Sequence, residues 1–137
     1  MEQVAVKMVE GDAGTSAEDM RKEVKVMSRL LHPHVARTLG AYWQEAAKGK
    51  GKPGGATKVY LVQALQKGGE VDKWISRRVL DEDAHRRLAF ELLSALAFLH
   101  ANGIMHRDIK PQNILMGDES DTSPLRIVDL GLVKWCK

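Results

Sequence analysis

Short β-branched runs in the first half of the chain predict three strands. Residues 4–9 read Val-Ala-Val-Lys-Met-Val, and residues 38–43 and 59–64 show a similar mixture of apolar and aromatic side chains. Residues 44–58, between the last two runs, are rich in Gly, Ala and Lys and contain a proline. We therefore predict an antiparallel strand pair joined by a long loop, with the first strand lying earlier in the chain.

A helix is predicted between the first two of these runs. Thr15 and Glu18 have the spacing of a capping box, which marks the start of a helix. An apolar stripe follows at the helical positions Met20, Val24, Met27 and Leu31. Pro33 ends the helix, because proline lacks a backbone N–H and clashes with the preceding turn.

The second half of the chain predicts a short helix over residues 71–78, a long helix and two further strands. An acidic start at 81–83 precedes apolar residues of helical period, and Gly103 is suited to the position just after the helix end. These apolar residues are Ala84, Leu88, Leu92, Ala95, Leu96 and Leu99. Residues 114–116 and 125–128 are apolar runs around a polar turn, which predicts a strand pair.

The composition is typical of a globular domain. The 137 residues are 28% charged and 44% hydrophobic, which argues against a disordered chain. The net charge of +3 is mild, so nucleic-acid binding is not expected, and no apolar run approaches the ~20 residues that span a bilayer. Cys136 is the single cysteine, and the N-terminus lacks a signal-peptide pattern. We therefore expect an intracellular, cytoplasmic protein with no membrane segment.

The most specific pattern in the chain is His106-Arg107-Asp108-Ile109-Lys110-Pro111-Gln112-Asn113. An Asp, a Lys and an Asn so close together, in a loop closed by a proline, are hard to explain as packing. Asp108 suits a base that accepts a hydroxyl proton, Lys110 offsets phosphate charge, and Asn113 offers an amide oxygen to a hard cation. A polar turn after a helix is the structural alternative. The combination favours phosphoryl transfer.

This stretch fits H-R-D-x-x-x-x-N at every fixed position, and it resembles the catalytic loop of the eukaryotic protein kinases. The Lys110-Pro111 pair resembles the serine/threonine branch of that family. The resemblance extends from near residue 3 to residue 131, where Asp-Leu-Gly at 129–131 is similar to D-F-G with Leu in place of Phe.

The resemblance implies ATP and Mg²⁺ as cofactors. Asp108 and Lys110 would be the catalytic residues, and Asn113 and Asp129 would hold the metal. Lys7, within Val-Ala-Val-Lys, is similar to the strand lysine that contacts the ATP phosphates and pairs with a helix glutamate. The structural alternative for Lys7 is a lysine on the solvent face of a strand.

Two glutamates compete to be the partner of Lys7. Glu23 is preferred because it and the His-Pro-His-Val sequence at 32–35 share the register of the family, whereas Glu18 competes by its distance along the chain. The structural alternative for Glu23 is an exposed helix residue with i,i+4 contacts. Ala5 would pack on the adenine ring.

Residues 59–66, followed by Gly-Gly-Glu, resemble the strand and hinge that hold adenine in this family. The carbonyl of Ala64 and the backbone of Gln66 would bond the adenine edge, and Leu115 would form the floor under the ring. Glu70 falls at a position where an acid often binds the ribose. An acid there is also favoured by the dipole of a following helix, so both interpretations of Glu70 stay open.

The implied fold class is α+β, a two-lobe protein kinase-like fold that is incomplete. Its parts would be an N-lobe portion over 1–63, a hinge over 64–67, the start of the C-lobe over 68–131, and a truncated start of the activation segment over 132–137. No glycine-rich phosphate loop precedes Lys7 and no A-P-E motif follows residue 131. We therefore expect an internal fragment of a kinase domain, marginally stable and nearly inactive by itself.

The expected function is that of a serine/threonine protein kinase, which transfers the ATP γ-phosphate to a hydroxyl of a protein substrate. The alternative is a catalytically inactive, pseudokinase-like binding module. A decayed kinase tends to lose one of its motif residues, and the retention of Lys7, Asp108 and Asp129 favours the enzyme. The segments that the chain lacks favour the binding module.

Overall fold

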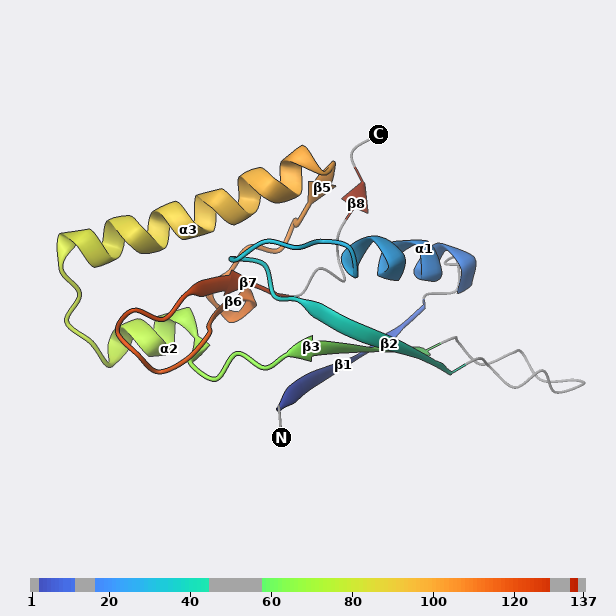
Figure 1. Ribbon diagram of the computed structural model, residues 1–137, viewed down its shortest axis with the longest axis horizontal. Helices are drawn as coiled ribbons and strands as arrows, with labels where there is room; N and C mark the ends of the chain where they lie inside the picture. Colours follow the sequence, from blue (N-terminus) through green and yellow to red (C-terminus); the bar gives the residue numbers. More distant parts are fainter. Residues whose placement is uncertain (1–2, 12–16, 45–57, 129–133, 136–137) are drawn as a thin grey trace, which may run out of the picture. The chain divides into compact units, whose positions relative to one another are not determined.

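The computed structural model describes residues 3–11, 17–44, 58–128 and 134–135 of the chain (Figure 1). Its contacts divide the chain into two compact units. The first unit comprises residues 1–30 and 37–64, and the second comprises residues 31–36 and 65–137. Helix and sheet are combined within each unit, as the prediction of an α+β fold requires.

The first unit is built on an antiparallel sheet of three strands in the order β1-β3-β2. The strands are β1 (Val4–Glu10), β2 (Thr38–Gln44) and β3 (Lys58–Ala64), which confirms the three strands predicted for this half of the chain. The central strand β3 contributes the best-buried side chains, Val59 and Leu61.

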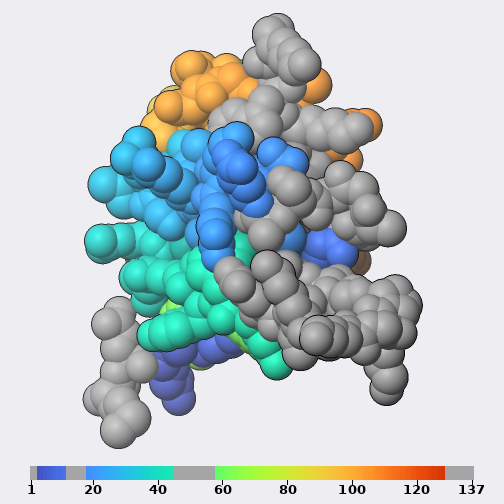
Figure 2. Space-filling model, turned by 90° about the vertical axis from the view of Figure 1, so that its right-hand side faces the viewer, coloured from blue at the N-terminus to red at the C-terminus, as the bar shows by residue number. Residues whose placement is uncertain are grey.

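Helix α1 (Ala17–Met27) accompanies this sheet, and Figure 2 shows it in blue against the strand β2. On this helix, the Arg21 guanidinium lies 5.5 Å from the ring centroid of Trp43 on β2. The predicted stripe is buried at Met20, Val24 and Met27. The helical period therefore places one face of α1 toward the core of the unit.

The prediction that Leu31 continues this stripe is wrong. Leu31 is 65% exposed, and Leu30 is buried instead, at 5% exposure. The physical reason is that α1 ends at Met27, so the helical period no longer sets which side chains point inward. The predicted helix start at Thr15 lies outside the described residues.

The second unit contains a sheet in the order β4-β6-β7, formed by β4 (Gly69–Glu70), β6 (Ile114–Met116) and β7 (Leu125–Ile127). The pairing of β6 with β7 is antiparallel, which confirms the predicted strand pair. A further short pair joins β5 (Ile104–Met105) to β8 (Lys134–Trp135).

Residues 31–36 add to this sheet although they lie between two elements of the first unit along the chain. Val35 forms a parallel bridge with Ile127. The N–H of Ala36 donates to the Ile127 carbonyl at 2.9 Å, and the N–H of Ile127 donates to the His34 carbonyl at 2.9 Å. This connection is therefore an edge of the second unit's sheet.

Two helices cover the second unit's sheet. The short helix α2 (Val71–Ser76) ends two residues earlier than predicted, with Arg77 as its C-cap. The long helix α3 (Glu82–Ala101) begins where the acidic start predicted, because Asp81 accepts a hydrogen bond from the N–H of Ala84 at 2.8 Å. Gly103 follows the helix with a φ of 72°, as expected for a residue after a helix end. The core of the unit joins Trp74, Leu88, Ile114, Met116 and Leu125.

A tight turn leads from the first unit into β4. The N–H of Gly69 donates to the Gln66 carbonyl at 3.3 Å, and the N–H groups of Lys67 and Gly68 donate to the carbonyls of Gly117 and Met116 at 3.0 and 2.9 Å. The turn therefore lies against the end of β6, with its backbone bonded at successive residues.

Gly68→Ala should lower the free energy of unfolding by about 1–3 kcal/mol. A Cβ at this position would stand 2.2 Å from the Asp118 carbonyl oxygen, and backbone cannot move away as a flexible side chain can. Urea titration followed by circular dichroism measures the change. Gly40→Ala is the matched control, since a Cβ there meets nothing within 4 Å. Equal unfolding free energies for the two variants would contradict the prediction.

Candidate active site

The predicted catalytic loop brings its three chemical side chains together. The Nδ2 of Asn113 donates to the Asp108 backbone carbonyl and to its carboxylate Oδ2, both at 2.9 Å. The Lys110 Nζ lies 3.3 Å from the same Oδ2. A short 3-10 helix (Pro111–Asn113) turns the chain so that Asn113, 5% exposed, faces back toward Asp108. The loop thus holds a carboxylate beside a cation and an amide.

His106 fixes the loop from inside. It is 2% exposed, and its Nδ1 accepts the backbone N–H of Asp108 at 3.2 Å. Because Nδ1 accepts, Nε2 carries the ring proton and donates to the Val128 carbonyl at 2.8 Å. The N–H of Val128 in turn donates to the Asn113 carbonyl at 3.0 Å. His106 is therefore an internal scaffold that ties the loop to the end of β7.

The backbone of the loop is strained next to Asp108. Arg107 has a φ of 65°, the one positive φ at a non-glycine residue among the described parts of the chain. Such a conformation costs about 1–3 kcal/mol and persists where surrounding contacts enforce it, most often at functional sites. The bonds of His106 and Asn113 on either side of Arg107 supply that enforcement.

In the first unit, Ala5 and Lys7 lie half-buried on one face of β1, paired with Gln63 and Leu61 of β3. Their shared face is the one on which β3 buries Leu61. Lys7 is thus not on the solvent-exposed side of its strand, in contrast to the structural alternative raised by the sequence.

The two candidate partners of Lys7 differ in their surroundings. Glu23 is half-buried, and burial, followed by the charge of Asp19, raises the pKa of its carboxyl above the ordinary value. Glu18 is on the surface and pairs with Lys22 at 3.1 Å. Lys7 itself has an interaction partner, so it is not a free cation.

The residues expected around adenine and ribose belong partly to the first unit and partly to the second. Ala64 ends β3, and its N–H donates to the Arg37 carbonyl at 3.2 Å. In the second unit, Glu70 and Leu115 are direct partners in the β4–β6 ladder. Glu70 precedes α2 but makes no side-chain cap bond, and pairs with Lys73 at 3.2 Å. Both interpretations of Glu70 therefore remain.

Gln66 is nearly buried, at 7% exposure, and its Oε1 accepts from the Arg126 Nη1 at 2.9 Å. Arg126 has no role among the predictions from the sequence, because an arginine in a short strand is usually a solvent-facing residue. No pattern in the sequence reports its partner, which lies far away along the chain.

The two residues expected to hold the metal are Asn113 and Asp129. Asp129 and the adjoining Leu130 lie outside the described residues. Asn113 donates through Nδ2 to Asp108, and its amide oxygen is a hard ligand of the type that Mg²⁺ prefers. A group of three or more His, Cys, Asp or Glu side chains that could hold a metal does not occur over 3–11, 17–44, 58–128 and 134–135.

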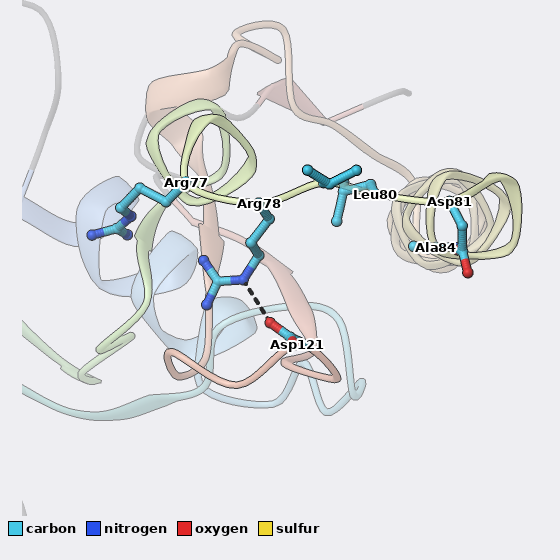
Figure 3. Close-up of a pocket in the computed structure, with 7 residues that line it drawn as sticks. Arg77, Arg78, Leu80, Asp81, Ala84 and Asp121 are labelled. Atoms are coloured by element: carbon cyan, nitrogen blue, oxygen red, sulfur yellow. Dashed lines mark hydrogen bonds and ion pairs between the residues drawn. The ribbon is translucent and has the colours of Figure 1, made fainter.

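A cavity of about 510 Å³ lies where the connection from α2 to α3 meets the turn after β6 (Figure 3). Its lining residues are Arg77, Arg78, Val79, Leu80, Asp81, Ala84 and Asp121. The Arg78 Nε and the Asp121 Oδ1 are 3.1 Å apart, and the Arg78 guanidinium stacks 4.0 Å above the Trp74 ring. None of the predicted site residues lines this cavity.

Over the residues that the structure describes, no helix is both long and apolar enough to cross a bilayer.

Comparison with known proteins identifies the class to which this loop and fold belong. The family model for the protein kinase domain matches residues 1–137. Calcium-dependent protein kinase 5 of Plasmodium berghei is 32% identical, over 96% of this chain and 22% of its own length. The putative CBL-interacting protein kinase 13 of rice is 36% identical, over 96% of this chain and 24% of its own. The serine/threonine-protein kinase chk-2 of Caenorhabditis elegans is 36% identical, over 85% of this chain and 23% of its own length.

The chain belongs to the protein kinase domain family, and the α+β kinase-like fold expected from its motifs is confirmed. It spans about a quarter of the length of the curated relatives it matches.

Proposed function

We propose that this chain carries the catalytic loop of a serine/threonine protein kinase, which transfers the γ-phosphate of ATP to a hydroxyl of a protein substrate. The observation that carries the proposal is the joint geometry of Asp108, Lys110 and Asn113. The Lys110-Pro111 pair and the similarity to a protein named as a serine/threonine kinase support this substrate class.

In this proposal Asp108 accepts the proton of the substrate hydroxyl as its oxygen attacks the γ-phosphorus. The bond from that phosphorus to the bridging oxygen of ADP breaks, and ADP leaves with the electron pair. Lys110, beside the carboxylate, offsets the negative charge of the phosphoryl group. Asn113 orients Asp108 through Nδ2, so a single residue both positions the base and presents an oxygen to the metal.

Mg²⁺, when bound, neutralises phosphate charge, and Asn113 and Asp129 would hold it. ATP would be bound by the residues that match the family's nucleotide site. Lys7 would contact its phosphates with Glu23 as partner, Ala5 and Leu115 would cover the two faces of the adenine ring, and the backbones of Ala64 and Gln66 would bond its edge. Glu70 would bind the ribose.

An inactive, pseudokinase-like module that binds a partner without chemistry is the second candidate. Transfer of labelled phosphate from ATP to a mixed serine and threonine peptide library, measured on the full-length gene product, separates the two. Phosphorylated peptides support the enzyme, and nucleotide binding without transfer supports the binding module.

Lys7→Met and Asp129→Asn should each weaken Mg-ATP binding by about tenfold or more. In this proposal each substitution removes a charge that would contact phosphate or metal, and a charge-assisted contact of this kind contributes about 1.5–3 kcal/mol. Isothermal titration calorimetry on the full-length gene product measures the dissociation constant. The matched controls are Lys22→Met, on the exposed side of α1, and Asp83→Asn, in an exposed ion pair of α3. Unchanged affinity in both site variants would refute these two assignments.

A further inference from the structure

Arg126 joins three separate segments of the second unit. Its Nη1 donates to the Gln66 Oε1 at 2.9 Å, and its Nε donates to the Pro33 carbonyl at 3.2 Å. The same guanidinium lies over Gly117, where an added Cβ would stand 2.6 Å from Nη1. One side chain on β7 therefore contacts the 31–36 connection, the turn that begins at Gln66 and the turn after β6.

The contacts of Arg126 are not those of an ordinary surface ion pair. Arg126 has an electrostatic effect on one acid, Asp118. The pKa of the Asp118 carboxyl is lowered first by hydrogen bonds from Ser120, and the charge of Arg126 makes the last contribution. The bonded partners of the Arg126 guanidinium are two neutral oxygens, the Gln66 amide and the Pro33 carbonyl. The hydrogen bonds of Arg126 therefore connect chain segments to one another.

The segment that Arg126 holds is the one expected to contact adenine. Gln66 is 7% exposed, so its side chain has little freedom once its Oε1 is bonded. Its carbonyl closes the turn onto Gly69, and the next residue, Lys67, donates its N–H to Gly117, directly below the guanidinium. Arg126 therefore bonds the side chain of Gln66 directly, and it lies beside Gly117, to which the backbone of the turn is bonded.

We propose that Arg126 is a positioning residue for nucleotide recognition, which sets the backbone of Gln66 at the adenine edge. The inference rests on the proposed function, because it assumes that Gln66 bonds adenine. Recognition through backbone groups requires them at fixed places, since hydrogen bonds weaken steeply with misalignment. Loss of the Arg126–Gln66 bond loosens the adenine contact and leaves the phosphate contacts unchanged.

The test uses the full-length gene product with the variants Arg126→Met, Gln66→Met and the double variant. Gln66→Glu is the conservative variant, because it keeps an acceptor for the guanidinium, and Arg86→Met is the control, because Arg86 forms an exposed pair with Glu82 on α3. Calorimetry with adenosine and with magnesium tripolyphosphate separates recognition of the base from recognition of the phosphates. Steady-state kinetics with Mg-ATP gives KM and kcat.

We expect adenosine affinity and the KM for ATP to worsen about five- to tenfold in each single Met variant. Tripolyphosphate affinity and kcat should stay within twofold. The double variant should be no worse than either single one, because both remove the same bond. Arg86→Met should behave like the unsubstituted protein. Gln66→Glu, which keeps an acceptor for the guanidinium, should retain more adenosine affinity than Gln66→Met. Should Arg126→Met fail to fold, the pair Gln66→Met and Gln66→Glu carries the same comparison, since both leave the bond to Pro33 intact.

The outcomes separate this inference from the function on which it rests. If the unsubstituted protein binds neither adenosine nor Mg-ATP, the proposed function itself is refuted, and the inference with it. If it binds both and the Met variants match it, Arg126 has no positioning role while the function stands. Equal losses for adenosine and tripolyphosphate indicate a general structural role, which also overturns the inference.

Discussion

Replacing Asp108 by Asn should lower phosphoryl-transfer turnover by about 100-fold or more and leave Mg-ATP affinity unchanged. The amide keeps the shape of the carboxylate and can still meet the Nδ2 of Asn113 through its oxygen, so the loop should hold its geometry. It cannot accept the proton of the substrate hydroxyl. Single-turnover transfer to a peptide that the unsubstituted protein phosphorylates, together with calorimetric titration of Mg-ATP, measures the two quantities.

Asp83→Asn is the matched control for Asp108→Asn, because it makes the same chemical change in an exposed ion pair with Arg86 on α3. It should leave both turnover and affinity unaltered. Turnover of Asp108→Asn within a few-fold of the unsubstituted protein would show that Asp108 is not the base. A parallel loss of nucleotide affinity would place its role in binding.

Replacing Trp74 by Ala should lower the free energy of unfolding by about 3–5 kcal/mol. Trp74 is fully buried, in a core cluster with Leu88, Ile114, Met116 and Leu125, and the truncation leaves a cavity among these neighbours. Because native domains are stable by only about 5–15 kcal/mol, this is a large fraction of the total. Urea unfolding, followed by far-UV circular dichroism of the backbone, measures this loss in the free energy of unfolding.

Two comparisons sharpen the test of Trp74. Trp74→Phe should lose less stability, because an aromatic ring remains and the substitution removes an indole N–H that has no hydrogen-bond partner among the described residues. Tyr42→Ala, at a side chain 69% exposed, should change stability by no more than about 0.5 kcal/mol. A loss of less than about 1 kcal/mol for Trp74→Ala would mean that the core around α2 is less tightly packed than described.

Local patterns were sufficient for most of the elements. The strand runs, the stripe at Met20, Val24 and Met27, and the start of α3 at Asp81 each depend on neighbours a few residues away, which is why the sequence predicts them. Leu31 was misplaced because the period of α1 was extended past the helix end at Met27. Where a helix ends depends on how other segments pack against the chain, and a local sequence pattern does not contain that information.

The sequence by itself determined the grouping of Asp108, Lys110 and Asn113, since these residues lie within one short loop whose geometry is set by neighbouring residues. The tertiary structure alone decided that residues 31–36 join the second unit's sheet and that Arg126 holds Gln66, 60 positions away along the chain. The physical reason is that these contacts depend on how distant segments meet. A hydrogen bond between residues far apart leaves no period or spacing in the sequence, whereas a loop that carries its own chemistry does.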